Sequence, residues 1–270
     1  MKTFLHLIYV DFTSFFNLNA ISCRKHWEKL VKTQNNMNQK FSEIYANSIK
    51  KPEEFWKNVS DDIFWFKKPS KILNKSNPPF YKWYEDGVTN TCYNALDFHI
   101  DNGRGDRNAL IYDSPITGNK KIYTYKELRE KVSKFAGVLQ DQGIKKGDRV
   151  IIYMPMIPEA VIGMLACGRI GAVHSVVFGG FASNELASRI DDSKAKILLT
   201  ASCGFEPGRT VQYKPLVDEA IKLASHKIEK LILFQRPDNE VKLNSPNEIS
   251  WEEALSNAKN VDCVEMNANE

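Results

Sequence analysis

The sequence predicts an α/β protein in which a helical N-terminal cap is followed by a largely parallel, doubly wound sheet. From residue 149 onward, apolar strand patterns alternate with helical patterns, an order typical of a parallel sheet with helices on both faces. Several of these strands are continuous apolar runs, which indicates burial on both sides. Residues 39–66 are instead rich in aromatic side chains at helical spacing, and they predict the cap.

Composition divides the chain into three parts. Residues 1–36 are apolar, aromatic and poor in acids, so they fit either a leader peptide or an upstream extension outside the fold. Residues 37–85 comprise the helical, aromatic cap, in which Pro52 starts a second short helix, and a lysine- and proline-rich linker. A phosphate-binding strip is the alternative interpretation of those lysines. Residues 86–270 contain the alternating strands and helices.

The segment before residue 149 predicts a hairpin between two helices. Thr124 and Glu127 have the spacing of a capping box, which marks the start of the second helix. In chain order, the predicted elements are a helix starting within 90–99, strands at 109–113 and 121–125, and a helix closed by Gly143.

The segment after residue 149 predicts the parallel sheet. Its strands are predicted at 149–154, 172–178, 196–201 and 230–234. Its helices are predicted to begin at Pro158, to be capped by Ser183, and to cover 215–224 and 251–258. No strand is predicted after residue 258.

Two loops follow strands of this sheet, and ligands of such sheets bind beyond the carboxyl ends of the strands. The first loop contains Phe178, Gly179 and Gly180. Two glycines let the backbone approach a ligand closely, and the amides of the next helix start can face an anion. A plain tight turn between strand and helix is the simpler interpretation of the same residues.

The second loop contains Glu206, Pro207, Gly208 and Arg209 within residues 202–213. Pro-Gly favours a type II turn, in which the glycine takes a positive φ. Such a turn fixes where Arg209 projects, and an arginine there suits a bidentate contact with phosphate. A surface arginine paired with Glu206 is the alternative.

Other classes of function lack support in the sequence. Lys and Arg exceed Asp and Glu by only 37 − 33 = 4, which argues against a nucleic-acid partner. No apolar run has the ~18 residues of a membrane span. The five cysteines and five histidines lack the spacing of a metal site, and widely spaced, odd-numbered cysteines indicate free thiols in an intracellular, reducing compartment. Phosphate-loop, GxGxxG and GxSxG motifs are also missing, so the residues alone identify no reaction.

Several consecutive blocks resemble the AMP-forming acetyl-CoA and propionyl-CoA synthetases. They are PEEFW at 52–56 and the segments 81–112, 124–139 and 147–201, the last containing VVFGGF. The resemblance covers about residues 40–265 and implies the large domain of an adenylate-forming enzyme, with ATP and Mg²⁺, CoA and a short carboxylate as substrates and no tightly bound cofactor. The EPGR sequence at 206–209 looks more like the propionyl-CoA-type branch.

The resemblance also implies roles for the two loops. Phe178, Gly179 and Gly180 would lie along the CoA path, and the loop from Glu206 to Arg209, with Pro207 and Gly208 at its turn, would contact the nucleotide end of CoA. Arg209 is the residue expected to pair with a CoA phosphate. The mitochondrial matrix is the expected compartment, with the cytosol as the alternative.

The sequence departs from the family in what it lacks. The family's YTSGTTGxPK-type phosphate loop, adenine-binding segment, acyl-pocket tryptophan, hinge aspartate and catalytic lysine have no counterpart in the 270 residues. We therefore expect no catalytic residue and no metal ligand in this chain, which looks like the incomplete N-terminal part of such a domain and is expected to be inactive alone. A non-catalytic CoA-binding or partner-docking remnant is the alternative.

Overall fold

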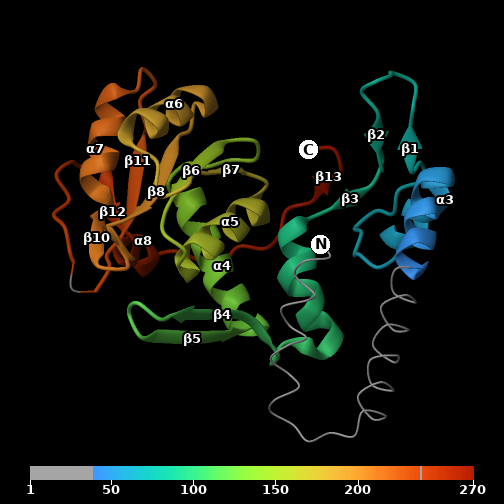
Figure 1. Cartoon of the computed structure of the whole chain (residues 1–270), viewed down its shortest axis with the longest axis horizontal. Coiled ribbons are helices and arrows are strands. Elements are labelled where there is room, and N and C mark those ends of the chain that lie inside the picture. Colours follow the sequence, from blue (N-terminus) through green and yellow to red (C-terminus); the bar gives the residue numbers. More distant parts are fainter. Residues whose placement is uncertain (1–38, 238) are drawn as a thin grey trace, which may run out of the picture. The chain divides into compact units, whose positions relative to one another are not determined.

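The computed structural model describes residues 39–237 and 239–270, and the chain divides into two compact units between Asp62 and Ile63 (Figure 1). In the first unit, residues 39–50 are helical, and α3 (Pro52–Ser60) begins with proline in its first turn. The predicted helix start at Pro52 is therefore confirmed. The predicted leader, residues 1–36, lies outside the described residues, and the predicted domain boundaries stay predictions.

The second unit, residues 63–270, contains a five-stranded sheet in the order β12-β11-β8-β6-β7. All four pairings are parallel. The strands are β6 (Arg149–Tyr153), β7 (Val173–Val176), β8 (Ile197–Ala201), β11 (Lys230–Phe234) and β12 (Glu248–Ser250). The four predicted strands are confirmed. Strand β12 was missed because three half-buried residues, one of them charged, carry no apolar run.

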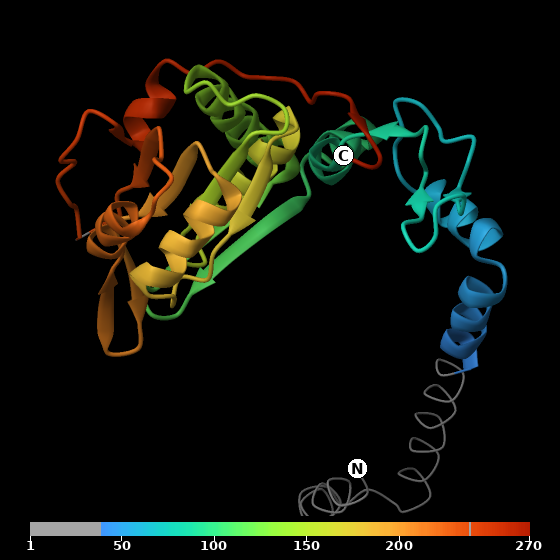
Figure 2. The same ribbon diagram turned by 90° about the horizontal axis from the view of Figure 1, so that it is seen from above.

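Alternate residues of the central strands pack into two separate cores. Val150 and Ile152 contact the core formed with α4 (Tyr125–Asp141) and α5 (Pro158–Ile170), whereas Ile151 and Tyr153 contact the core formed with α6 (Ser183–Ser193) and α7 (Tyr213–Leu223). Neighbouring side chains of a strand point to opposite faces, and Figures 1 and 2 show these helix pairs on the two sides of the sheet. The doubly wound parallel sheet predicted from sequence is therefore confirmed.

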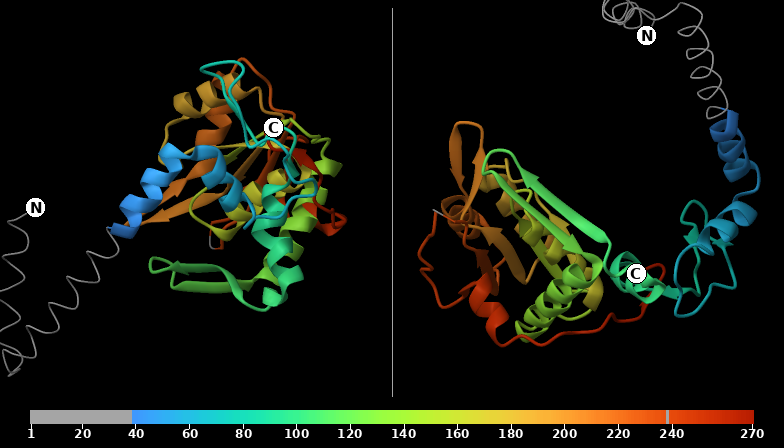
Figure 3. Two further views of the ribbon diagram at one scale, coloured as in Figure 1. Left: turned by 90° about the vertical axis from the view of Figure 1, so that its right-hand side faces the viewer. Right: turned by 90° about the horizontal axis from the view of Figure 1, so that it is seen from below.

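Helix α4 begins and ends where its sequence signals predict. The Thr124 side chain accepts a hydrogen bond from the Glu127 amide at 3.2 Å, and the Glu127 carboxylate accepts one from the Thr124 amide at 2.8 Å. Gly143, with φ +86°, follows the helix end. The preceding hairpin, β4 (Asn108–Ser114) and β5 (Asn119–Thr124), is a separate two-stranded sheet, drawn in green in Figure 3. The capping box and the hairpin are both confirmed.

Short pairings and a π-wound helix fill the segment between residues 63 and 107. The predicted linker contains an antiparallel pairing of β1 (Leu73–Asn74) with β2 (Lys82–Trp83). After β3 (Val88–Thr89), a helix with mostly π winding covers residues 91–104, with a kink where Gly103 takes φ +73°. The predicted helix start within 90–99 is confirmed. The π winding of this helix was not expected.

The C-terminal segment returns across the helices of the sheet. After α8 (Trp251–Ser256), residues 257–265, here called the strap, lead to β13 (Met266–Asn267), which pairs antiparallel with β3 (Figure 2). Ser133 of α4 exchanges two hydrogen bonds with the backbone of Val261, at 2.7 and 2.9 Å. The expectation of no strand after residue 258 was wrong, because two residues in a polar stretch give no strand pattern.

Helix α4 and the strap pack without space for a side chain at Gly137. A Cβ atom on Gly137 would lie 2.0 Å from the carbonyl oxygen of Lys259. That oxygen belongs to the backbone, so the strap itself would have to move. Glycine is required here by close approach, although alanine has the higher intrinsic helix propensity.

We predict that Gly137→Ala lowers the free energy of unfolding by about 1–3 kcal/mol, the usual cost of overpacking. Gly168→Ala is the matched control, because its Cβ would meet nothing closer than 3.9 Å and the residue also lies within a helix. Urea titrations of both variants measure the effect. A Gly137→Ala protein as stable as Gly168→Ala would contradict the close contact.

Candidate functional site

Both loops predicted as ligand sites lie beyond the carboxyl ends of strands, after β7 and after β8. The second one is a hairpin rather than an irregular loop. Strands β9 (Cys203–Glu206) and β10 (Arg209–Gln212) pair antiparallel, with Glu206 opposite Arg209. The hairpin projects from the sheet at the lower left of Figure 2. The loop expected over residues 202–213 is thus corrected to a hairpin.

Pro207 and Gly208 form the two-residue turn of this hairpin. Gly208 takes φ +75°, the conformation that a type II turn requires at its third position. A Cβ there would touch nothing, so conformation rather than space selects glycine. The turn predicted from the Pro-Gly sequence is confirmed.

Glu206 and Arg209 form a surface ion pair across the turn. The Arg209 Nε and Nη2 atoms both lie 2.7 Å from Glu206 Oε2. The Arg209 side chain is 71% exposed, and the Glu206 side chain is 44% exposed. The structure therefore contains the pairing that was the alternative interpretation of this loop. An exposed pair of this kind contributes at most about 1 kcal/mol, so it holds the guanidinium in place weakly.

Two tyrosines hold the first loop against the base of the hairpin. The Tyr153 hydroxyl, at the end of β6, donates to the carbonyl oxygen of Phe181 at 2.8 Å and lies 3.3 Å from that of Gly179. Its ring stacks on Tyr213 with centroids 5.0 Å apart. Both side chains are buried. The sequence analysis missed these two residues, although Tyr153 lies within a predicted strand and Tyr213 is the last residue of a predicted loop.

The hydroxyl of Tyr213 lies between the two predicted loops. A Cβ on Gly179 would lie 2.1 Å from this oxygen, and a Cβ on Gly204 of the hairpin would lie 3.1 Å from it. The buried tyrosine ring cannot swing aside, so Gly179 is required by space. The structure thus brings the first loop to the base of the hairpin, while Glu206 and Arg209 lie at the hairpin's tip.

Phenylalanines give the first loop an apolar, solvent-facing surface. Phe178 is 71% exposed, and its ring packs edge-on against Phe181 at 5.7 Å. A Cβ on Gly180 would lie 2.5 Å from the Phe178 ring. An exposed phenylalanine beside flexible backbone suits contact with an apolar part of a ligand.

Both tyrosines are harder to ionise than an exposed tyrosine because they are buried. Burial raises the pKa of Tyr213 to about 12, with the neighbouring Tyr153 and the charge of Glu206 adding to the shift. Burial also raises the pKa of Tyr153. A tyrosine is already protonated near neutral pH, and burial widens the margin by which these two phenols stay neutral; the Tyr153 hydroxyl donates to the Phe181 carbonyl.

Ser183 does not cap α6 as predicted. It is the first residue of the helix, the N-cap is Ala182, and the serine hydroxyl donates to a Glu219 carboxylate oxygen at 2.7 Å. The hydroxyl therefore joins α6 to α7. A tertiary partner outcompeted the local helix amide, and a single sequence does not reveal such a partner.

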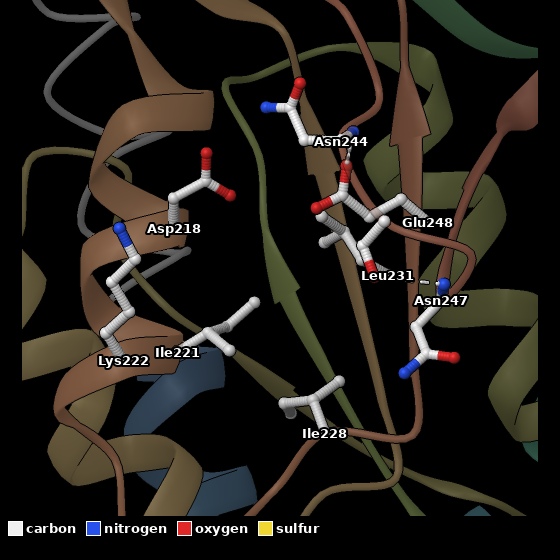
Figure 4. Close-up of a pocket in the computed structure, with 9 residues that line it drawn as sticks. Asp218, Ile221, Lys222, Ile228, Leu231, Asn244, Asn247 and Glu248 are labelled. Atoms are coloured by element: carbon white, nitrogen blue, oxygen red, sulfur yellow. Dashed lines mark hydrogen bonds between the residues drawn. The ribbon is translucent and has the colours of Figure 1, made fainter.

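A separate pocket of about 330 Å³ lies between α7 and the amino ends of β11 and β12 (Figure 4). Asp218 and Lys222 of α7 line one wall, and Asn244 and Glu248 line the other. The Glu248 carboxylate accepts a hydrogen bond from the backbone amide of Asn244 at 2.8 Å. Because ligands of parallel sheets bind at the carboxyl ends, this pocket lies at the opposite end from the candidate site.

A buried polar cluster was also missed by sequence reasoning. Within the described residues, one atom each of Cys92, Asp97 and Cys263 lie within 4.8 Å of one another. The guanidinium of Arg169 contacts all three side chains. Cysteines so far apart in the chain show no ligand spacing, and only the fold brings them together. Cys167, by contrast, is a buried residue of the α4–α5 core.

Comparisons with known proteins match most of the chain. A family model for the acetyl-coenzyme A synthetase N-terminus matches residues 41–95, and one for the AMP-binding enzyme family matches residues 98–266. Acyl-CoA synthetase short-chain family member 3, mitochondrial, of Rattus norvegicus and of Homo sapiens is 52% identical over 221 residues, which are 82% of this chain and 32% of those proteins.

Two further proteins extend the comparison. Acetyl-coenzyme A synthetase of Streptomyces coelicolor is 44% identical over 201 residues, 74% of this chain and 31% of that protein. The solved acetoacetyl-CoA synthetase from Streptomyces lividans superposes with a TM-score of 0.73 at 23% identity, covering 82% of this chain and 34% of that one. This structural likeness confirms the fold. The chain spans about a third of the length of the curated relatives it matches.

We predict that Tyr153→Phe loosens the loop at residues 178–181. The change leaves the Phe181 carbonyl without its 2.8 Å donor, which lowers the free energy of unfolding by about 1 kcal/mol. Hydrogen exchange of amides 178–182 should become faster, while exchange in the strands of the sheet stays the same. Tyr112→Phe, the same chemical change on β4, is the control. Unchanged exchange in this loop would show that the tyrosine does not hold it.

Proposed function

The chain belongs to the AMP-binding enzyme family, and from that premise we propose that it serves an AMP-forming ligase that joins a short-chain carboxylate to CoA. One observation carries this proposal: the N-terminal model of acetyl-coenzyme A synthetase and the AMP-binding enzyme model match consecutive segments, 41–95 and 98–266. The relatives named as acyl-CoA and acetyl-coenzyme A synthetases support the same activity.

The proposed reaction has two steps. A carboxylate oxygen attacks the α-phosphorus of ATP, and pyrophosphate leaves, which gives an acyl-adenylate. The thiol of CoA then attacks the acyl carbon, loses its proton, and displaces AMP. We propose Mg²⁺ as the ion that accompanies ATP. The described residues support the second step better than the first, because the candidate site lies at the β9–β10 hairpin and the 178–181 loop.

We propose that the β9–β10 hairpin receives the nucleotide end of CoA through Arg209. The Arg209 side chain is 71% exposed, and among the described residues its ion-pair partner is Glu206. A charge-assisted bond from arginine to phosphate contributes about 1.5–3 kcal/mol, more than the surface pair with Glu206. A phosphate therefore competes successfully for Arg209, and Pro207 and Gly208 keep the tip in position while it does.

The loop of Phe178, Gly179 and Gly180 is proposed to line the path of the CoA arm. Its bare backbone and the exposed Phe178 ring provide an apolar, sterically open surface. We propose these three loop residues as binding residues, and none of them as catalytic.

We also propose a branch of the family and a cellular compartment for the chain. Glutamate at position 206 favours the propionyl-CoA-type branch that the sequence resembles. We propose the mitochondrial matrix as the compartment, because the relatives from rat and human carry that location in their names. Among the described residues, none of the helices has the length and apolar character to cross a membrane.

We predict that the purified chain binds CoA and that Arg209→Ala weakens this binding roughly 10-fold or more, the equivalent of losing one charge-assisted hydrogen bond. Calorimetric titration measures the affinity. Arg189→Ala removes the same charge from an exposed position on α6 and should leave the affinity unchanged. Glu206→Gln should bind at least as tightly as the parent, because it releases Arg209.

The two parts of the proposal fail separately. Equal CoA affinities for Arg209→Ala and Arg189→Ala would contradict the hairpin contact while leaving the ligase proposal in place. A protein with 4′-phosphopantetheine affinity equal to its CoA affinity would also contradict contact with the nucleotide end. No binding of CoA by the chain would contradict CoA binding by these residues altogether.

A further inference from the structure

The cluster of Cys92, Asp97, Arg169 and Cys263 is built from three segments. Cys92 and Asp97 lie in the helix of residues 91–104, Arg169 lies near the end of α5, and Cys263 lies in the strap. Arg169 and Cys92 are 2% and 0% exposed, whereas Cys263 is half-buried. Cys92 is thus sealed inside the protein, and Cys263 lies on the partly exposed side of the cluster.

The cluster is not arranged to hold a cation. The Arg169 Nη1 atom lies 2.7 Å from an Asp97 oxygen, 3.0 Å from the Cys263 sulfur and 3.7 Å from the Cys92 sulfur. The guanidinium therefore already occupies the position among these three groups where a metal ion would have to sit. A second hydrogen bond, from Nη2 to the other Asp97 oxygen at 3.1 Å, fixes it there.

The same arrangement favours a thiolate. A hydrogen bond from the Cys263 thiol, with the charge of Arg169 adding, lowers the pKa of Cys92 against the effect of burial. The same hydrogen bond, together with burial, raises the pKa of Cys263, so the thiolate forms on Cys92 and Cys263 keeps its hydrogen. Thiolates next to arginine are the reactive form of cysteine.

We propose that Cys92 and Cys263 are a redox-active pair that a hydroperoxide converts to a disulfide, which ties the strap to the helix of residues 91–104. The Cys92 thiolate attacks the peroxide: an S–O bond forms, the O–O bond breaks, and the leaving hydroxide takes a proton from solvent to become water. The Cys263 thiol then attacks the sulfenic sulfur: an S–S bond forms, the S–O bond breaks, and the departing hydroxide takes the thiol hydrogen and leaves as a second water. Two electrons pass from the sulfurs to one molecule of peroxide.

The strap supplies the movement that bond formation needs. The sulfurs lie within 4.8 Å, whereas a disulfide requires about 2.05 Å. Cys263 lies in a segment without helix or strand. The next residue, Val264, makes two hydrogen bonds: its amide donates to the Arg169 carbonyl, and its carbonyl accepts from the Asn90 side chain at 2.8 Å. A shift of this segment brings its sulfur inward, and the guanidinium keeps its two bonds to Asp97.

The test treats the purified chain with a small excess of hydrogen peroxide and then alkylates the remaining thiols. We expect the chain to lose two of its five thiols, with a peptide pair linking positions 92 and 263 in the mass spectrum. The disulfide closes a long loop, so the oxidised chain should melt roughly 5–10 °C above the reduced chain. Dithiothreitol should reverse both changes.

Cys263→Ser should abolish the cross-link and the shift in melting temperature. Cys203→Ser is the control and should keep both, because Cys203 does not belong to the cluster. Because Cys263 is half-buried, its serine variant tests the proposal without loss of the fold. Oxidation of Cys263 to sulfinic or sulfonic acid without a cross-link would overturn the proposal. A one-to-one zinc complex that needs both sulfurs would also overturn it, because the cluster would then be a cation site.

Discussion

The buried ion pair between Arg169 and Asp97 organises the second unit of the chain. Arg169 also donates to the backbone carbonyl of Val261 at 2.5 Å, so one side chain joins the helix of residues 91–104, α5 and the strap. Although burial disfavours its charge, the hydrogen bond to Asp97 raises the pKa of Arg169 above its usual range. Breaking such a pair by removing one partner typically costs about 3–5 kcal/mol. The pairing of β13 with β3 depends on the strap that Arg169 holds.

Local signals made most of the second unit predictable. The capping box at Thr124 and Glu127, the prolines that start helices, and the continuous apolar strands specify structure within a few residues of themselves, and each appears where it was predicted. Alternation of strands and helices then leaves few topologies, because parallel crossovers are right-handed. The large sheet therefore follows from the order of its elements.

The elements that sequence reasoning missed are those fixed by distant partners. Strands β12 and β13 are only three and two residues long, and each exists because a neighbouring strand presents free backbone groups to it. Ser183 prefers Glu219 of another helix to its own helix end. In the candidate site, Pro207 and Gly208 indicate the turn. No sequence pattern indicates that Tyr153 and Tyr213 lie behind it. The members of the cysteine cluster are likewise neighbours only in space.

Tyr153 contacts both the interior of the protein and the candidate site. Its ring belongs to the core shared by α6 and α7, and its hydroxyl reaches the backbone of the 178–181 loop. Any substitution that repacks that core also displaces this hydroxyl, and with it the loop. Mutations in the interior therefore reach the candidate binding surface without an exposed residue being changed. A change at position 153 therefore alters interior packing and the position of the 178–181 backbone together.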